Sequence, residues 1–254
     1  MTLPYVDVPT VGGIQVFGVS VFAAIGGGLV VALYQARRAK LPENVFMGMI
    51  AALTVGALFG AHVFDVAWYR WAEAAEDPRI WVRVHDGISL FGALLVIVGG
   101  MLVWSRVLGL APAPTADATA LAVLVAITIG RIGCALVHDH PGVPTSSPLG
   151  IDFPPWRTQH LGFPDGARLH DVGLEELLAM IPLTAAAWAL ARRGLRAGLL
   201  ASLAAMTYAS VRFALDFLRI EPVRAGLTGG QWGSLVLFVI GLAGFALVLR
   251  RRDA

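Results

Sequence analysis

Residues 121–140 read LAVLVAITIGRIGCALVHDH. This stretch is apolar and uncharged up to Arg131, and it then runs into a histidine-rich segment. A cation inside a membrane-spanning helix is costly unless an anionic group meets it, and such residues usually serve a function. We therefore interpret Arg131 as the centre of a functional site carried by a membrane helix.

The composition of the whole chain supports a membrane location. Of its 254 residues, 57% are hydrophobic and only 14% are charged, with a mean hydropathy of +0.73, whereas soluble domains carry about 25% charged residues. The net charge of +2 does not favour a nucleic-acid partner. A single cysteine excludes an intramolecular disulfide. Residues 1–10 contain no basic residue, which favours a short exported tail over a cleaved signal peptide.

Apolar segments of about 20 residues are long enough to cross a bilayer as helices. The sequence predicts an all-α integral membrane protein, with residues 1–254 forming one seven-helix domain. The predicted spans are residues 12–34, 44–66, 86–107, 118–137, 172–190, 198–218 and 231–249. Residues 138–171 contain six prolines, so we expect an ordered or lid-like loop there rather than a helix.

Basic residues set the predicted orientation. Nine of the nineteen lysines and arginines lie in short runs at the ends of the first, fifth and seventh spans. Because cytoplasmic loops carry an excess of such residues, we predict an outside N-terminus, an inside C-terminus and a periplasmic loop at 138–171.

In this topology two arginines share one depth. Arg131 and Arg212 each lie about six residues from an outer helix end, which is roughly 9 Å at 1.5 Å per residue. A guanidinium group donates paired hydrogen bonds to phosphate oxygens. The two arginines therefore predict a pocket for a phosphate head group that enters from the outer leaflet.

Other polar residues gather near these arginines. Asp216 and Arg219 follow Arg212 at i+4 and i+7, and Cys134 and His138 follow Arg131 at i+3 and i+7, so each set is expected on one helical face. Further polar residues near outer helix ends are His85, His170, Glu176, Gln231 and Ser234.

Several motifs occur in a characteristic order. Gly130, Arg131 and Gly133 are followed by Asp139 and Gly142; residues 212–219 read RFALDFLR and residues 230–234 read GQWGS. With His170 and Glu176, these motifs resemble those of the prolipoprotein diacylglyceryl transferases. These bacterial inner-membrane enzymes move a diacylglyceryl group from phosphatidylglycerol to the lipobox cysteine of a preprolipoprotein. The resemblance implies three partners: phosphatidylglycerol, a lipobox segment and the bilayer. We expect no cofactor, no metal and no nucleic-acid partner.

The chain also departs from the family pattern. Where the family motifs have an asparagine, a tyrosine and an arginine, this chain has Cys134, Phe17 and His62. The segment Ser89-Leu90-Phe91-Gly92 also lacks the motif histidine that is often proposed as the base. The implied reaction is attack by a peptide thiolate on the glycerol carbon next to phosphate, with glycerol-1-phosphate leaving. It needs cationic stabilisation of the leaving phosphate and a base for the thiol.

The resemblance and the requirements of this reaction indicate roles for individual residues. We expect catalytic roles for Arg131, Arg212, Asp139, His138 and His140. We expect substrate-binding roles for Arg219, Asp216, His85, His170, Glu176, Gln231, Ser234 and Gly142. The base is left open among Asp139, His138, His140, His85 and His170.

Three other interpretations fit the same residues. The arginines could form structural ion pairs with Asp139 or Asp216, and Gln231 and Ser234 could cap a helix. His138-x-His140 with neighbouring carboxylates could hold a zinc-like ion in a metal-dependent membrane enzyme. A phospholipid-binding or transport protein on the same scaffold would keep the arginines without the chemistry.

Overall fold

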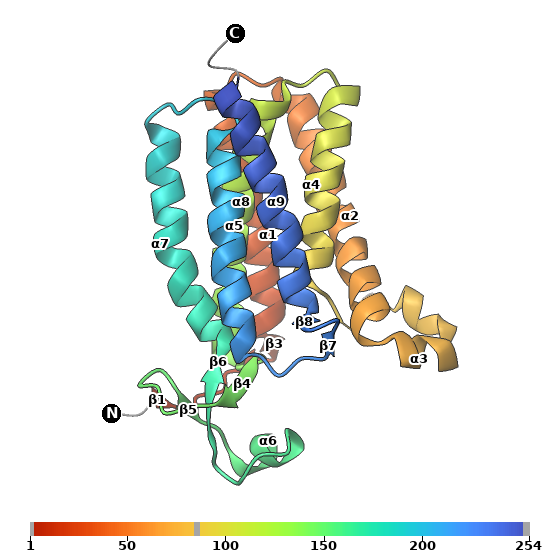
Figure 1. The fold of residues 1–254 in the computed structure, drawn as a ribbon, viewed down its shortest axis with the longest axis vertical. Helices are drawn as coiled ribbons and strands as arrows, with labels where there is room; N and C mark the ends of the chain where they lie inside the picture. The colour runs from red at the N-terminus through yellow and green to blue at the C-terminus, as the bar shows by residue number, and fades with distance from the viewer. Residues whose placement is uncertain (1–2, 84–86, 251–254) are drawn as a thin grey trace.

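Seven long helices form the body of the molecule in the computed structural model, which describes residues 3–83 and 87–250 (Figure 1). Six of them are long and apolar enough to cross a membrane, and the seventh, α8, is shorter at 17 residues. Their bounds are α1 Val16–Arg38, α2 Glu43–Tyr69, α4 Leu90–Val107, α5 Pro112–Val137, α7 Val172–Arg192, α8 Leu199–Leu215 and α9 Gly229–Arg250. The predominantly helical fold expected from the sequence is confirmed, with six candidate membrane-spanning helices.

Helix ends differ from the expected ones where local backbone geometry intervenes. α4 begins at Leu90 rather than at residue 86, which lies outside the described residues. α5 begins at Pro112 rather than at residue 118 but ends at Val137 as expected, where His138 takes a left-handed conformation with φ 48° that ends the helix. α8 ends at Leu215 and continues as a single 3₁₀ turn, η2, over Asp216–Leu218.

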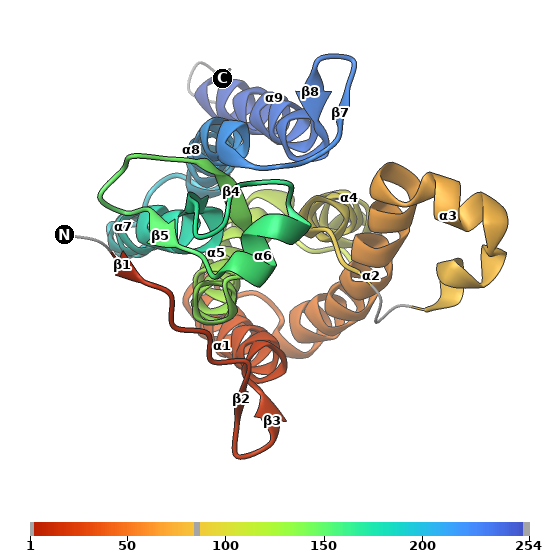
Figure 2. The same ribbon diagram turned by 90° about the horizontal axis from the view of Figure 1, so that it is seen from below.

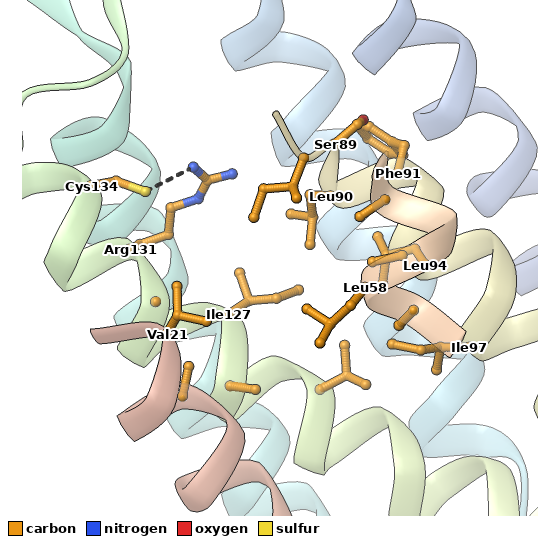
Figure 3. A pocket seen from close by; sticks show the side chains of 18 of the residues that line it. Val21, Leu58, Ser89, Leu90, Phe91, Leu94, Ile97, Ile127, Arg131 and Cys134 are labelled. Carbon is orange, nitrogen blue, oxygen red and sulfur yellow. Dashed lines mark hydrogen bonds between the residues drawn. The ribbon is translucent and has the colours of Figure 1, made fainter. Parts of the chain in front are cut away.

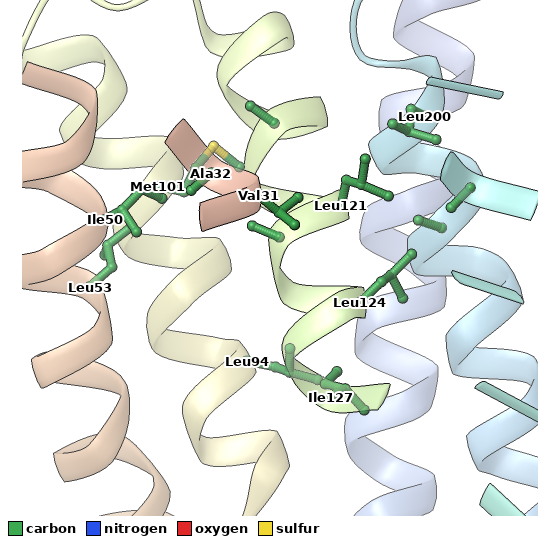
Figure 4. Packing of buried hydrophobic residues seen from close by; sticks show 14 of the residues in the cluster. Val31, Ala32, Ile50, Leu53, Leu94, Met101, Leu121, Leu124, Ile127 and Leu200 are labelled. Atoms are coloured by element: carbon green, nitrogen blue, oxygen red, sulfur yellow. The ribbon is translucent and has the colours of Figure 1, made fainter. Parts of the chain in front are cut away.

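Small residues let the helices approach one another closely, as expected for helix packing in lipid. A Cβ added at Gly27 of α1 would lie 2.5 Å from Ile129 of α5. One added at Gly92 of α4 would lie 2.2 Å from the Gly60 carbonyl oxygen of α2. The main buried cluster joins α1, α2, α4, α5 and α8, as Figure 4 shows with Val31, Ile50, Leu94, Leu124 and Leu200.

A small mixed sheet covers the end of the bundle opposite the C-terminus (Figure 1). Its strands are β1 Leu3–Pro4, β4 Pro141–Pro144, β5 Ile151–Asp152 and β6 Arg168–Asp171, in the order β1-β5-β6-β4. β1 pairs with β5 in parallel, and the other two pairings are antiparallel. The loop expected at 138–171 is thus ordered, and it also holds a short helix, α6, over Pro155–His160, which the sequence analysis did not expect.

Shorter elements complete the chain. The connection between α2 and α4 includes α3 Trp71–Glu76 and the 3₁₀ turn η1 Pro78–Val82. Seen from below, α3 extends from the end of α2 away from the bundle (Figure 2). Two hairpins, β2 Thr10–Val11 with β3 Ile14–Gln15 and β7 Val223–Arg224 with β8 Leu227–Thr228, lead into α1 and α9.

Candidate active site

A cavity of about 730 Å³ opens between α1, α2, α4 and α5 and has one polar end. Figure 3 shows its apolar walls, among them Val21, Leu58, Leu94 and Ile127, with Arg131 reaching in from α5. Arg212 and Arg219 also line this cavity. An apolar chamber with a few convergent polar groups is the usual form of a small-molecule site.

One buried carboxylate holds the two arginines together. Glu176 of α7 lies 3.0 Å from Arg131 Nη2 and 3.3 Å from Arg212 Nη1, both distances measured to Glu176 Oε2. The Tyr208 hydroxyl donates to Glu176 Oε1 at 3.2 Å. Glu176 is fully buried and does not line the cavity, whereas both guanidinium groups do. The carboxylate therefore stands behind the arginines and leaves their other faces to the cavity.

The charge network continues along the end of α8. Arg212 Nη2 lies 2.7 Å from Asp216 Oδ1, and Arg219 Nε lies 3.8 Å from the same oxygen and 2.5 Å from Glu221 Oε1. The structure thus bears out the expected i+4 pairing of Arg212 with Asp216. Arg219 lies beyond the α-helical turns, yet it still contacts Asp216.

The network pairs three guanidinium groups with three carboxylates. Arg131, Arg212 and Arg219 contact Glu176, Asp216 and Glu221, of which Glu176 and Asp216 are fully buried. Within residues 3–83 and 87–250, Arg212 Nε is buried without a hydrogen-bond partner. A buried donor left unpaired is unfavourable, so the arrangement suits an anion bound from the cavity side.

A helix cap positions Asp216. Thr228 Oγ1 accepts from the Gln231 backbone N–H, and Gln231 Oε1 accepts from the Thr228 N–H, each at 3.1 Å. This reciprocal pair is a capping box at the start of α9. The Thr228 hydroxyl also donates to Asp216 Oδ2. Ser234 donates to the Gly230 carbonyl at 2.8 Å. Neither Gln231 nor Ser234 lines the cavity, so their substrate contacts stay predictions.

Gly142 brings β4 against the segment that carries Arg219. It forms an isolated antiparallel bridge with Arg219, and an added Cβ would lie 2.4 Å from the Leu218 carbonyl oxygen. Only glycine allows this approach of the two backbones. Gly142 therefore helps to place Arg219, and direct contact with substrate stays a prediction.

His138 does not join the arginines, although it was expected on the face of Arg131. Its left-handed backbone turns it away from the helical repeat. Nδ1 contacts the buried carboxylate of Asp171, and Nε2 contacts the Val6 carbonyl at 3.2 Å. The Tyr5 ring lies 4.8 Å away, centre to centre. His138 thus ties the N-terminal segment to the start of α7, where Asp171 also caps the helix through Leu174.

Asp139 and His140 face the cavity. His140 Nδ1 lies 3.6 Å from Asp139 Oδ1, and Cys134 Sγ accepts a hydrogen bond from Arg131 Nη1 at 3.5 Å. Burial raises the pKa of the Asp139 carboxyl, although Arg131 opposes this shift. Burial, followed by the charges of Arg219, Arg131 and Arg212, holds the pKa of His140 well below its usual value.

The same cluster combines three residue types that can bind a metal ion. Cys134, Asp139 and His140 offer ligand atoms that all lie within 4.8 Å of one another, and these are atom types that bind zinc. The three guanidinium groups at this end of the cavity repel a divalent cation. His138, the other ligand considered from the sequence, is bound to Asp171 instead.

Two further candidates lie elsewhere. His170 Nδ1 lies 2.6 Å from Glu175 Oε1, and His170 is not in the cavity lining. His85 lies outside the described residues, so its predicted role has no structural counterpart.

A model of the prolipoprotein diacylglyceryl transferase family matches residues 8–247. The chain belongs to this family. Three similar relatives are each named phosphatidylglycerol–prolipoprotein diacylglyceryl transferase. The protein of Chromohalobacter salexigens is 29% identical over 78% of this chain and 73% of its own. The protein of Bordetella avium is 26% identical over 82% of this chain and 78% of its own length. The protein of Cereibacter sphaeroides is 25% identical over 98% of both chains.

The departures from the family pattern fall into two groups in the structure. Phe17, Leu90 and Phe91 line the cavity, and the Phe91 ring lies 5.9 Å from Arg212 Cζ. His62 is fully buried away from the cavity lining, with its ring nitrogens 3.0 and 2.8 Å from the Gly87 and Ile80 carbonyl oxygens. The changes around the cavity therefore make its wall more apolar, whereas His62 anchors the turn η1.

Sequence reasoning missed three residues that hold this site together. Tyr208 precedes Arg212 by four residues, a spacing that places both on one helical face and could have revealed it. Asp171 directly precedes an apolar helix, which is a recognisable cap position. Thr228 was detectable as the first residue of the Thr-x-x-Gln pattern at 228–231.

Proposed function

We propose that this family member is a phosphatidylglycerol–prolipoprotein diacylglyceryl transferase. In this proposal the phosphate of phosphatidylglycerol binds the cavity-facing sides of Arg131 and Arg212, with Arg219 beside them, and the acyl chains occupy the apolar part of the cavity. The observation that carries the proposal is the cluster of three arginines, with carboxylates behind two of them, at the polar end of an otherwise apolar chamber. The names of the relatives supply the donor and the acceptor.

The proposed step is a substitution at carbon. The sulfur of the lipobox cysteine forms a bond to the glycerol carbon next to phosphate while the bond from that carbon to the phosphate oxygen breaks. Glycerol-1-phosphate leaves with the electron pair, and the thiol proton passes to a base. Preorganised donors stabilise developing negative charge strongly in a site that excludes water. Arg131 and Arg212 would supply them.

The membrane arrangement belongs to the same proposal. Seven spanning helices would place the N-terminus and the small sheet on the periplasmic side of a bacterial inner membrane. The basic residues Arg37 and Arg38 at the end of α1 and Arg250 at the end of α9 would then face the cytoplasm. The polar end of the cavity would open toward the outer leaflet.

The test uses the full-length protein in vesicles of labelled phosphatidylglycerol with a lipobox peptide. Arg131→Lys and Arg212→Lys keep a positive charge but lose the planar pair of donors. We expect each to lower transfer by about 10²-fold or more, as removal of one preorganised donor does. The control Arg168→Lys alters an exposed pair with Asp152 outside the cavity and should leave transfer unchanged. Wild-type binding of the labelled lipid without any transfer would instead indicate the phospholipid-binding alternative.

A further inference from the structure

Five residues were candidates for the base that activates the acceptor thiol, and the structure separates them by access to the cavity. Both ring nitrogens of His138 are engaged, by Asp171 and by the Val6 carbonyl, and its side chain is only 7% exposed. His170 is held by Glu175 outside the cavity lining. Among the candidates in the described ranges, only Asp139 and His140 line the cavity that Arg131 also lines.

His140 is held firmly in place and remains accessible. Its carbonyl accepts from the Val172 N–H at the start of α7 at 3.0 Å, and Pro141 restricts its backbone from the other side. Its side chain is 24% exposed, so a substrate in the cavity can reach the ring. Nδ1 lies 3.6 Å from Asp139 Oδ1, which is too long for a hydrogen bond. The negative charge of this carboxylate still favours the tautomer with its proton on Nδ1 and a lone pair on Nε2.

A sulfur atom already lies next to this pair. Cys134 Sγ is within 4.8 Å of ligand atoms of both Asp139 and His140 and accepts from Arg131 Nη1. The structure therefore accommodates a sulfur atom close to both the guanidinium group and the imidazole ring. An acceptor thiol that approaches from the cavity would meet the same two kinds of group.

We propose that His140 is the general base that deprotonates the acceptor thiol and that Asp139 orients its ring. This inference rests on the proposed transferase function. The S–H proton moves to His140 Nε2 as the sulfur attacks the glycerol carbon. The bond from that carbon to the phosphate oxygen breaks, and the arginines stabilise the negative charge on the leaving phosphate. A neutral imidazole can take up the thiol proton, and the adjacent Asp139 carboxylate offsets the positive charge that the ring then carries.

The surroundings of His140 keep its ring in the neutral form. The charges that act on it are Arg219, Arg131 and Arg212, together with the adjacent Asp139. Burial and the three arginines hold the pKa of His140 well below its usual value. The ring is therefore neutral at pH 7 and loses its function as a base only when the pH falls through that lowered value.

The experiment compares two acceptors. His140→Gln is assayed in vesicles of labelled phosphatidylglycerol with a lipobox peptide that carries either cysteine or selenocysteine, whose selenol is already ionised at neutral pH. We expect the variant to lose about 10²-fold or more with the thiol peptide at pH 7, the usual contribution of a general base. We expect most of the transfer to return with the selenol peptide, and also with the thiol peptide as the pH rises toward the thiol pKa. The matched control His160→Gln, at an exposed position in α6, should behave as wild type.

The outcomes separate this inference from the function on which it rests. Equal losses for both acceptors at every pH would assign His140 a structural role and overturn the inference, as would full activity of His140→Gln with the thiol peptide. Arg131→Lys should fail with both acceptors, because an ionised nucleophile does not replace the phosphate site. If the wild-type protein transferred label to neither peptide, the transferase function itself would be contradicted.

Discussion

Replacement of Glu176 by glutamine should release the two arginines that it holds. The carboxylate is fully buried and is shared by Arg131 at 3.0 Å, Arg212 at 3.3 Å and the Tyr208 hydroxyl at 3.2 Å. In Glu176→Gln two guanidinium groups would face a neutral amide, whose NH₂ group is a donor and cannot pair with either of them.

The expected loss of stability is large because the partner removed is charged and buried. Breaking a buried ion pair by removing one partner costs about 3–5 kcal/mol, and here two cations lose the same partner. We expect the free energy of unfolding to fall by at least about 3 kcal/mol. Transfer should fall as well, because a misplacement of about 1 Å in a catalytic group can cost about 10²-fold.

The assay measures denaturant unfolding in detergent micelles by tryptophan fluorescence, together with transfer from labelled phosphatidylglycerol. Glu175→Gln is the matched control. Glu175 is the adjacent residue and contacts only His170 among the described ion pairs, so its replacement should cost about 1 kcal/mol, the usual net value of one hydrogen bond. If Glu176→Gln were as stable and as active as the control, the arginines would not depend on Glu176 and the reasoning would be refuted.

Three further predictions test the elements around the site. Gly142→Ala should lower transfer because its Cβ would lie 2.4 Å from the Leu218 carbonyl oxygen, whereas Gly99→Ala, with nothing within 4 Å of its Cβ, should fold and act normally; transfer assays on both variants make the comparison. Gln231→Ala should lower the free energy of unfolding by about 1 kcal/mol through loss of the cap, and a raised KM for phosphatidylglycerol in the same variant would restore Gln231 to the substrate-binding set. Ala57→Trp should fill the apolar part of the cavity and raise KM for the lipid, and equal KM values would show that the acyl chains bind elsewhere.

The long helices were predictable because a bilayer requires about 20 consecutive apolar residues to span it as a helix. Such a segment can be recognised from the sequence without knowledge of tertiary contacts. The contacts between Arg212, Asp216 and Arg219 were predictable for a similar reason, since residues three and four apart on a helix are neighbours. The contact of Cys134 with Arg131, three residues apart, follows the same rule.

Other features of the site depend on which helices meet. Glu176 lies on α7, and nothing in the local sequence indicates that it would join Arg131 of α5 to Arg212 of α8. His138 was misplaced because a single left-handed residue removes it from the helical repeat, and the periodicity does not show this. The choice between His138 and His140 therefore required the structure of the loop after α5.

The most direct test of the account is a measurement of contact between the lipid phosphorus and the guanidinium nitrogens of Arg131 and Arg212. Solid-state NMR on the ¹⁵N-arginine-labelled protein in phosphatidylglycerol bilayers can detect such a contact through ³¹P–¹⁵N dipolar coupling. The account predicts two strongly coupled guanidinium signals, one lost in Arg131→Lys and the other in Arg212→Lys. Couplings that survive both substitutions, or no coupling to either residue, would contradict a phosphate site at these arginines.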